Sequence, residues 1–205
     1  MTTGGDVVIR AARGEDSALA ALLVYSAGPV AFEHIFNRVH GRYVVDFLQS
    51  EFAKNQTMFS HRHHFVYELD GKVVATIGQF DKPSHDATFL GTARAIWGGY
   101  GWRGIVKGLL FELRLVKAPK KHCFYLCNIA VDPAVRGQGI AAKLVNFMAN
   151  QAKEAGYSRL SLDVAEQNHN ALRLYQNLGF EVLQRHKSYN KVLDSHLYME
   201  KQLVD

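Results

Sequence analysis

The sequence predicts one domain of the mixed α/β class. Its 205 residues, 48% apolar and 21% charged, suit a globular chain with a core of its own. The apolar run of residues 124–131 has the length and composition of a buried strand, and a turn of small residues and a helical pattern follow it. Two further β-rich runs, residues 64–69 and 72–80, are joined by Asp70-Gly71, a dipeptide typical of tight hairpins.

The N-terminal part is expected to form one strand and three helical segments. Residues 6–10 alternate as a short strand, and Asp16 or Ser17 can cap the helix that follows. A Gly-Pro pair ends this helix, and a later glycine separates two further helical segments that carry five aromatic residues. These aromatic residues are Phe32, Phe36, Tyr43, Phe47 and Phe52.

The histidine-rich stretch before the hairpin, His61-Arg62-His63-His64, raises the question of a metal site. No Cys, Asp or Glu lies close by at ligand spacing, and neighbouring side chains on a strand point to opposite faces. We therefore expect a solvated basic start to the strand and no metal.

Residues 81–121 separate the hairpin from the buried strand. Gly99-x-Gly101-x-x-Gly104 formally matches a dinucleotide fingerprint, but no buried strand precedes it and no acidic residue lies about 20 positions beyond it. We expect a flexible loop that presents Tyr100 and Trp102, and then a helix with an apolar packing face. That face would consist of Val106, Leu109, Leu110, Leu113 and Val116.

The stretch around the buried strand organises the rest of the chain. Only Asn128 interrupts its apolar run, and Pro133 ends the strand because it cannot donate to a ladder. The turn of residues 136–141 is rich in small residues, and the helix that follows has apolar positions four apart until Gly156. A strand, a small-residue turn and a helix N-terminus place unpaired N–H groups around one point, which suits a phosphate.

The C-terminal part continues with a strand, a helix and two strands. Residues 159–164 alternate as a strand, and Asn168 is placed to cap the next helix, which Gly179 ends. The last strands are expected at residues 181–187 and 196–201.

Charge and cysteine content give weaker constraints. The formal charge of +5 favours an anionic partner or a basic surface with no dedicated partner, and we expect no nucleic acid. Four residues of strand separate Cys123 and Cys127 by about 13 Å, too far for a disulfide, so we expect reduced thiols and a cytoplasmic setting. No apolar run of about 18 residues and no signal-peptide pattern is present, so no membrane partner is expected.

The turn and the segment after it resemble a known family. Arg136-x-x-Gly139-x-Ala141 behind the buried strand is similar to the acetyl-CoA pyrophosphate loop of the GNAT superfamily of N-acetyltransferases. A second strand, Asn168 and then Ala171-Leu172-x-Leu174-Tyr175-x-x-x-Gly179-Phe180 follow in the family's order, so that the resemblance covers about residues 122–200. It implies one domain over residues 1–205 with an insertion at about 81–121.

The resemblance also implies the details of the fold. The central sheet would be twisted and mostly antiparallel, with splayed parallel fourth and fifth strands and helices on both faces. Acetyl-CoA would be the co-substrate, and no metal would be needed. The cofactor would bind along the fourth strand, the loop and two helices. The residues implied are Ile129, Ala130, Val131, Arg136, Gly137, Gln138, Gly139, Ile140, Ala141, Ala142, Asn168 and Tyr175.

Two residues are the candidates for catalysis. In the family the position of Tyr175 holds a phenol that protonates the departing thiolate, although Tyr175 also lies on an apolar stripe and can be a core residue. Asp163 matches an acidic position that some members use as the base, and a structural role is equally open to it. The alternative bases are Glu68, His122, His169 and His196, or a chain of water molecules.

The expected reaction is acetyl transfer to a primary amine in a ternary complex, by a monomer or homodimer. A small-molecule acceptor is favoured because the insertion resembles the puromycin acetyltransferase type; a protein or peptide acceptor and a non-catalytic CoA-binding domain are the alternatives. A two-step route through Cys127 is disfavoured, since no cation adjoins it in the sequence. The acceptor site is expected to use residues 28–60, the insertion with Tyr100 and Trp102, and the tail after Ser188.

Overall fold

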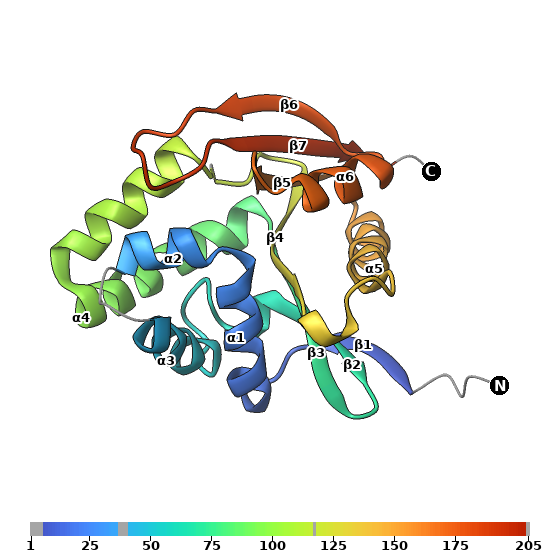
Figure 1. Ribbon diagram of the computed structural model, residues 1–205, viewed down its shortest axis with the longest axis horizontal. Helices are drawn as coiled ribbons and strands as arrows, with labels where there is room; N and C mark the ends of the chain where they lie inside the picture. The colour runs from blue at the N-terminus through green and yellow to red at the C-terminus, as the bar shows by residue number, and fades with distance from the viewer. Residues whose placement is uncertain (1–5, 37–40, 117, 204–205) are drawn as a thin grey trace.

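The computed structural model describes residues 6–36, 41–116 and 118–203, which form one sheet with helices against both of its faces (Figure 1). The sheet order is β1-β2-β3-β4-β5-β7-β6, and within the described residues β4 and β5 are its one parallel pair. This confirms the mixed α/β class and the mostly antiparallel sheet. The strands are β1 (Val7–Ala11), β2 (His64–Leu69), β3 (Lys72–Phe80), β4 (Cys123–Val131), β5 (Arg159–Ala165), β6 (Glu181–His186) and β7 (His196–Gln202).

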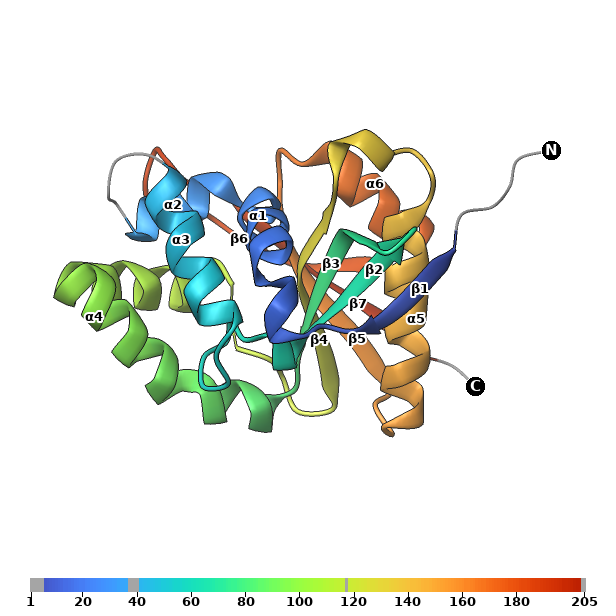
Figure 2. The ribbon, with the colours of Figure 1, turned by 90° about the horizontal axis from the view of Figure 1, so that it is seen from below.

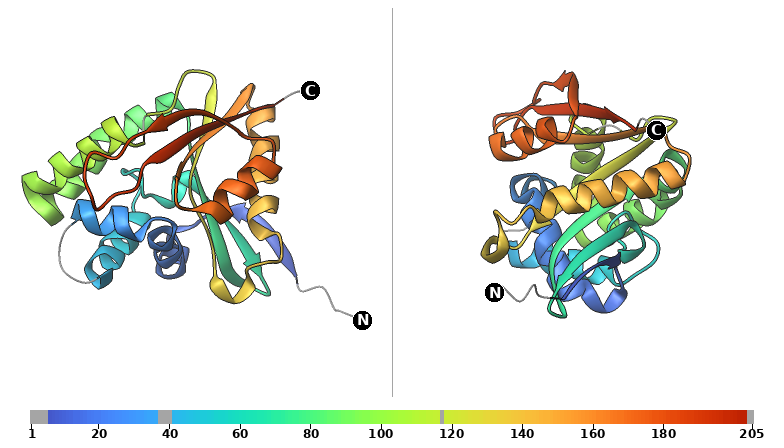
Figure 3. Two further views of the ribbon diagram at one scale, coloured as in Figure 1. Left: turned by 45° about the horizontal axis from the view of Figure 1, so that its top comes forward. Right: turned by 90° about the vertical axis from the view of Figure 1, so that its right-hand side faces the viewer.

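The hairpin between β2 and β3 forms where the sequence predicted it. Asp70 and Gly71 have φ angles of 51° and 75°, the left-handed conformation that a two-residue turn requires at both positions. The turn fixes the register of β2 on β3. At the opposite end of the sheet, β6 and β7 form the edge farthest from β1 (Figure 3).

Two hydrophobic cores lie on the two faces of the sheet, because successive strand residues point to opposite sides. Val66 packs in the core beneath α1 (Ser17–Ala27) and α3 (Gly41–Phe52), whereas its neighbour Tyr67 packs in the core beneath α5 (Ile140–Glu154) and α6 (His169–Asn177). Figure 2 shows α1 to α4 on one side of the strands and α5 on the other.

Most of the aromatic residues of the N-terminal helices belong to the first of these cores. Phe36 and Phe52 are buried, and Phe47 packs on Phe36 with ring centroids 5.1 Å apart. Tyr43 is 61% exposed. None of the five aromatic residues lines the cavity described below, so the core interpretation is correct for the buried ones. α2 (Pro29–Phe36) crosses above this core.

The insertion is a long helix, α4 (Lys82–Arg114), and the flexible loop that we expected around Tyr100 and Trp102 is wrong. Asp81 caps the helix by accepting a hydrogen bond from the backbone N–H of Ser84 at 2.8 Å. The helix is kinked at Gly101, whose φ of 65° and ψ of −164° lie outside the helical region. One glycine therefore interrupts α4, and the Gly-rich pattern does not form a loop.

The expected packing face of the second half of α4 is also wrong. Val106, Leu109, Leu110 and Leu113 are between 38% and 69% exposed. α4 contacts α2 at Gly108 instead, where a Cβ would lie 3.8 Å from Ile35. The apolar stripe faces outward, and a glycine at this contact permits a closer approach of the two helices than a leucine would.

The histidine-rich stretch forms a short 3₁₀ turn, His61–His63, ahead of β2. No group of three or more His, Cys, Asp or Glu side chains that could hold a metal ion occurs in the described part of the chain. The expectation of a solvated strand start is wrong for His64, which is only 1% exposed.

A search for membrane-spanning helices over the described ranges finds no single helix that is long and apolar enough. One bent pair, Gly14–Ala27 with Pro29–Phe36 at 97°, has the necessary length and composition when its two parts are taken together.

Candidate functional site

A cavity opens where β4 and β5 separate. The two strands pair from Cys123–Arg159 to Leu126–Leu162, and beyond that point β4 continues beside β3 and β5 continues beside β7. The cavity has a volume of about 570 Å³. Its walls come from both strands, the α1–α2 junction, α6 and the segment before β7. This is the splay that the sequence led us to expect between the fourth and fifth strands.

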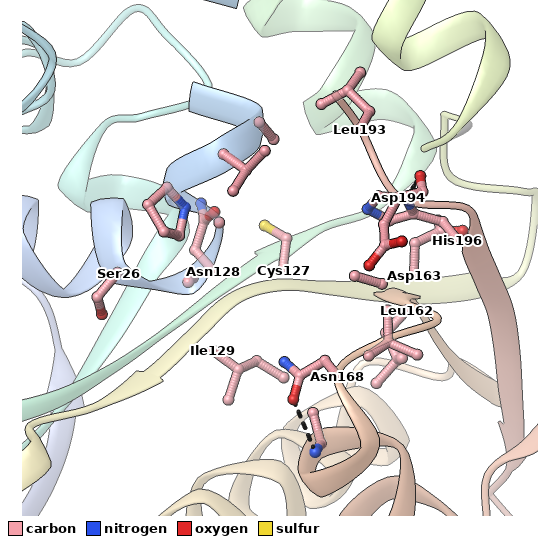
Figure 4. A pocket seen from close by; sticks show the side chains of 18 of the residues that line it. Ser26, Cys127, Asn128, Ile129, Leu162, Asp163, Asn168, Leu193, Asp194 and His196 are labelled. Carbon is pink, nitrogen blue, oxygen red and sulfur yellow. Dashed lines mark hydrogen bonds between the residues drawn. The ribbon is translucent and has the colours of Figure 1, made fainter. Parts of the chain in front are cut away.

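A β-bulge shapes the β4 side of the cavity. Thr76 pairs with Ala130 and Gly78 with Cys127, so that β4 has one extra residue opposite Ile77. Asn128 lies in the bulge and has a φ of 49°, a left-handed conformation that asparagine tolerates better than most residues. Cys127, Asn128 and Ile129 all line the cavity (Figure 4). The bulge therefore lies directly beyond the last β4–β5 pair.

The small-residue loop lies at the end of β4 and leads into α5. Gly137 and Gly139 have φ angles of 81° and 73°, which favour glycine, and a Cβ at either position would meet nothing within 4 Å. Gly139 is the N-cap of α5, so the backbone N–H groups of the first turn have no helical partner of their own. Arg136 folds back and donates a hydrogen bond from Nε to the Val131 carbonyl at 3.1 Å. The loop is exposed and can receive an anion.

The other residues expected around the cofactor differ in how far their side chains are accessible to a ligand. Ile140 is 3% exposed and packs in the core, so only its backbone is available to a ligand. The side chain of Ala130 packs in the opposite core beside α1 and α3. The half-buried side chains of Ile129 and Val131 pack at the edge of the α5 core, and Ile129 also borders the cavity. Gln138 is exposed in the loop, and Ala141 and Ala142 are half-buried in the first turn of α5.

Asn168 and Tyr175 reach the cavity from α6. Asn168 Oδ1 accepts a hydrogen bond from the backbone N–H of Ala171 at 3.2 Å, which confirms that it caps the helix. Tyr175 is 7% exposed and packs against Phe180 with a centroid separation of 5.9 Å, yet it also lines the cavity. Its burial raises the pKa of its hydroxyl, which is therefore protonated at neutral pH. Tyr175 is therefore a core residue that also borders the cavity.

Asp163 lies on β5 at the opposite side of the cavity. The hydroxyl of Tyr125 on β4 donates a hydrogen bond to Asp163 Oδ2 at 3.1 Å. Burial, and next the negative charge of Asp163, raises the pKa of Tyr125 well above its usual value, so Tyr125 remains a donor. The carboxylate of Asp163 is thereby held at the cavity wall.

His196 on β7 is the one alternative base among the four named side chains that lines the cavity. Its Nδ1 lies 3.1 Å from the Asp194 carbonyl, and because a carbonyl can only accept, Nδ1 carries the proton. Burial lowers the pKa of His196, which favours the neutral ring with Nε2 as an acceptor. Figure 4 shows Asp163, Asp194 and His196 close together on one side of the cavity.

The remaining base candidates lie elsewhere. Glu68 on β2 pairs with Arg10 at 2.8 Å, and His122 and His169 are exposed. None of the three lines the cavity. Position relative to the cavity therefore leaves Asp163 and His196 as candidates.

The acceptor end of the cavity was predicted only in part. Residues 26–31 and 191–194 line it, which agrees with the expected contribution of the α1–α2 region and the C-terminal tail. The insertion does not line it: Tyr100 packs against Phe36 at a centroid distance of 4.8 Å, and Trp102 is 60% exposed. The expected role of these two aromatic residues at the acceptor site is therefore wrong.

Three contributors to the site were missed by sequence reasoning. These are Tyr125, Asn128 as a bulge and Asp194. An asparagine within an apolar run was a signal for the bulge. The other two depend on which residues the sheet brings side by side.

The cysteines are free thiols, as expected. Burial raises the pKa of Cys127 to about 12, so its thiol is protonated at neutral pH although it lines the cavity. This is the state of an unreactive thiol.

Comparison with known proteins agrees with this geometry. The model of the acetyltransferase (GNAT) family matches residues 32–180. A [ribosomal protein bS18]-alanine N-acetyltransferase of Haemophilus ducreyi is 41% identical over 69 residues, which are 34% of this chain and 48% of that protein. A thialysine N-epsilon-acetyltransferase of Bos taurus is 41% identical over 64 residues, 31% of this chain and 38% of the relative. The chain thus matches less than half the length of these two relatives.

Solved structures share the fold over nearly the whole chain. An N-acetyltransferase from Staphylococcus aureus Mu50 superimposes with a TM-score of 0.71 at 23% identity, covering 94% of this chain and 99% of that one. The yncA protein of Salmonella typhimurium, solved with its cofactor acetyl-CoA, superimposes with a TM-score of 0.59 at 18% identity, covering 98% and 95%.

Proposed function

The chain belongs to the GNAT family of acetyltransferases. We propose that it is an acetyl-CoA-dependent N-acetyltransferase whose acceptor is a small molecule with a primary amine, acetylated directly in a ternary complex. The observation that carries the proposal is the cavity of about 570 Å³ between β4 and β5, with the phosphate-binding loop behind one strand and Asp163 on the other.

We place acetyl-CoA along β4 and the loop. The N–H groups from Gly137 to Ala142 receive the pyrophosphate, helped by the positive end of the α5 dipole and by the charge of Arg136. The pantetheine arm follows the edge of β4 at Ile129–Val131, which has no β5 partner. Asn168 and Tyr175 border the acyl end from α6. The acetyl group then lies in the cavity.

The reaction requires two protons to leave the nitrogen of an ammonium ion and one to reach the thiolate sulfur. A primary amine with a pKa near 10 arrives as an ammonium ion, and Asp163 takes its first proton, directly or through water, and releases it to solvent. The neutral nitrogen attacks the thioester carbonyl carbon, a C–N bond forms, and the C–S bond breaks. The Tyr175 hydroxyl donates its proton to the leaving sulfur, and the second proton of the nitrogen leaves through water and restores the Tyr175 hydroxyl. Burial keeps that hydroxyl protonated until this step.

The walls of the cavity favour a small cationic acceptor. The α1–α2 junction and residues 191–194 close it on the side away from the loop. Asp163 and Asp194 supply two carboxylates against the one ammonium group of Lys191, so an ammonium ion enters a site whose charged side chains are negative in sum. A peptide N-terminus or a lysine side chain is the second candidate, because one relative acts on a ribosomal protein.

An acceptor screen tests the proposal. The enzyme is incubated with acetyl-CoA and either small mono- and diamines or peptides with free N-termini and lysines, and CoA thiol release is followed. We expect turnover with a subset of the small amines and loss of that turnover in Asp163→Asn. Asp194→Asn should instead raise KM for the amine with a smaller effect on kcat. Turnover with peptides alone would refute the small-molecule assignment.

A further inference from the structure

A buried histidine lies directly behind the bulge of β4. His64 begins β2, is 1% exposed, and pairs with Gly78 at the position next to the bulge. Its ring packs against Phe52 with a centroid distance of 5.1 Å. This buried imidazole does not line the cavity between β4 and β5 and has no role in the chemistry above, so its contacts need a separate explanation.

The hydrogen bonds of His64 fix its tautomer. Nδ1 lies 2.8 Å from the carbonyl oxygen of Ser60, which can only accept, so Nδ1 carries the proton. Nε2 is then the acceptor for the side-chain amide of Asn128, at 3.2 Å. The ring is neutral, and burial lowers its pKa to about 4. A chain of two hydrogen bonds thus connects the Ser60 turn to the residue that forms the bulge.

The packing around these two hydrogen bonds requires a glycine at position 78. A Cβ on Gly78 would lie 2.8 Å from Cys127 Sγ and 3.0 Å from His64 Nε2. Any larger residue would therefore push the imidazole or the cysteine away from β3. The close approach lets the His64 ring lie beside β4 at Cys127 and Asn128.

We propose that His64 is a positioning residue that acts through Asn128: it holds the bulge in its left-handed conformation and so sets the direction of the β4 backbone at the cavity wall. This inference rests on the proposed function, because the backbone at Ile129 is the part of β4 beside which the thioester would lie. A backbone N–H aimed at the developing oxyanion lowers the barrier only if its direction is fixed beforehand. His64 supplies that fixed direction without contacting the substrate.

Two matched pairs of variants test the proposal. Asn128→Gly keeps access to positive φ and removes the side chain whose amide donates to His64, and it also makes the backbone of the bulge freer. His64→Asn keeps a donor toward Ser60 but has no atom at the Nε2 position, whereas His64→Gln places an amide near that position. We expect Asn128→Gly and His64→Asn each to lower kcat by about 10- to 100-fold with KM for acetyl-CoA nearly unchanged. His64→Gln should recover most of the rate.

The double variant separates positioning from general stability. If His64 acts only through Asn128, then His64→Asn combined with Asn128→Gly has the kcat of Asn128→Gly alone. If the two substitutions acted independently, the fold-reductions in kcat of the two single variants would instead multiply in the double variant. Unchanged kcat in both single variants, at temperatures where circular dichroism shows them folded, would overturn the proposal.

A measurement without turnover distinguishes this inference from the proposed function. The infrared carbonyl stretch of bound ¹³C-acetyl-CoA reports its hydrogen bonding. We expect a lower frequency in the wild type than in free acetyl-CoA, and a return toward the free value in Asn128→Gly and His64→Asn. A frequency that is lowered in the wild type and returns in both variants, together with no acetylation of small amines, would refute the acceptor and support the positioning role. An equal frequency in all variants would overturn that role.

Discussion

The Tyr125 hydroxyl donates a hydrogen bond to the Asp163 carboxylate at 3.1 Å, from β4 to β5, close to the point where these strands separate. The bond holds a negative charge at the wall of the cavity. Because Tyr125 is buried and its pKa is raised, it cannot take the role of the base itself. This pair is therefore the structural basis for assigning the base to Asp163.

Asp163→Asn should lower kcat/KM for the amine by about 10²- to 10⁴-fold at neutral pH. The asparagine can still accept the hydrogen bond of Tyr125, so the fold should be kept. Raising the pH should recover part of the rate, since more of the amine is then already neutral. A pH–rate profile from pH 6 to 10 measures this. His196→Gln is the comparison: a larger loss there would transfer the role of base to His196.

Tyr175→Phe removes only the hydroxyl and keeps the ring against Phe180. If that hydroxyl protonates the leaving thiolate, kcat should fall by about 10²- to 10⁴-fold while acetyl-CoA affinity and thermal stability change little. Single-turnover kinetics isolates the chemical step. Unimpaired chemistry would leave Tyr175 as a core residue and the acid unassigned.

Cys127→Ala should leave kcat nearly unchanged. The thiol is protonated at neutral pH because its burial raises its pKa to about 12, so it is a poor nucleophile. Mass spectrometry of the wild type mixed with acetyl-CoA alone should find no acetylated protein. An acetyl adduct at Cys127 that decays when amine is added would show a two-step transfer instead.

The stability of the fold should depend on pH through His64. Its pKa of about 4 in the folded chain lies below the ordinary value of 6.5, so between these values the unfolded chain binds the proton more strongly. The contribution of His64 is complete above pH 6.5 and is lost as the pH falls toward 4, which corresponds to about 2 kcal/mol between pH 7 and pH 5.

Urea unfolding at these two pH values checks this expectation. His64→Gln should lose less unfolding free energy between pH 7 and pH 5 than the wild type. Part of the loss should persist, because burial also lowers the pKa values of His34, His63 and His196. The same loss in the wild type and in His64→Gln would assign the pH dependence to those other groups.

Local signals in the sequence predicted much of the fold. The hairpin depends on Asp70-Gly71, β4 on a short apolar run, and the α6 cap on Asn168, and each of these patterns determines its own segment. α4 was predicted wrongly because glycines are ambiguous between a loop and a close helix contact, and only the tertiary neighbours decide between them, as Phe47 does at Gly99 and Ile35 at Gly108.

The site was less predictable than the fold. Asp163 and Tyr175 could be named by resemblance, whereas Tyr125 and Asp194 join the site only because β4, β5 and the segment before β7 meet there. No residue spacing within the sequence predicts that these three segments lie side by side. His64 was judged as part of a basic cluster, since its burial follows from the fold of residues 52–60 over it.

The most direct test of the account is acetyl-CoA binding to a pair of matched glycine variants. Gly139 and Gly156 lie at opposite ends of α5, have φ angles of 73° and 81°, and have open space where a Cβ would be. Glu at either position costs about 1 kcal/mol of stability for the positive φ, but only Gly139→Glu places a negative charge in the proposed pyrophosphate site. By isothermal titration, we expect tight acetyl-CoA binding in the wild type and in Gly156→Glu, and none in Gly139→Glu. Equal binding by both variants would contradict the placement of acetyl-CoA on the loop and, with it, the proposed site of transfer.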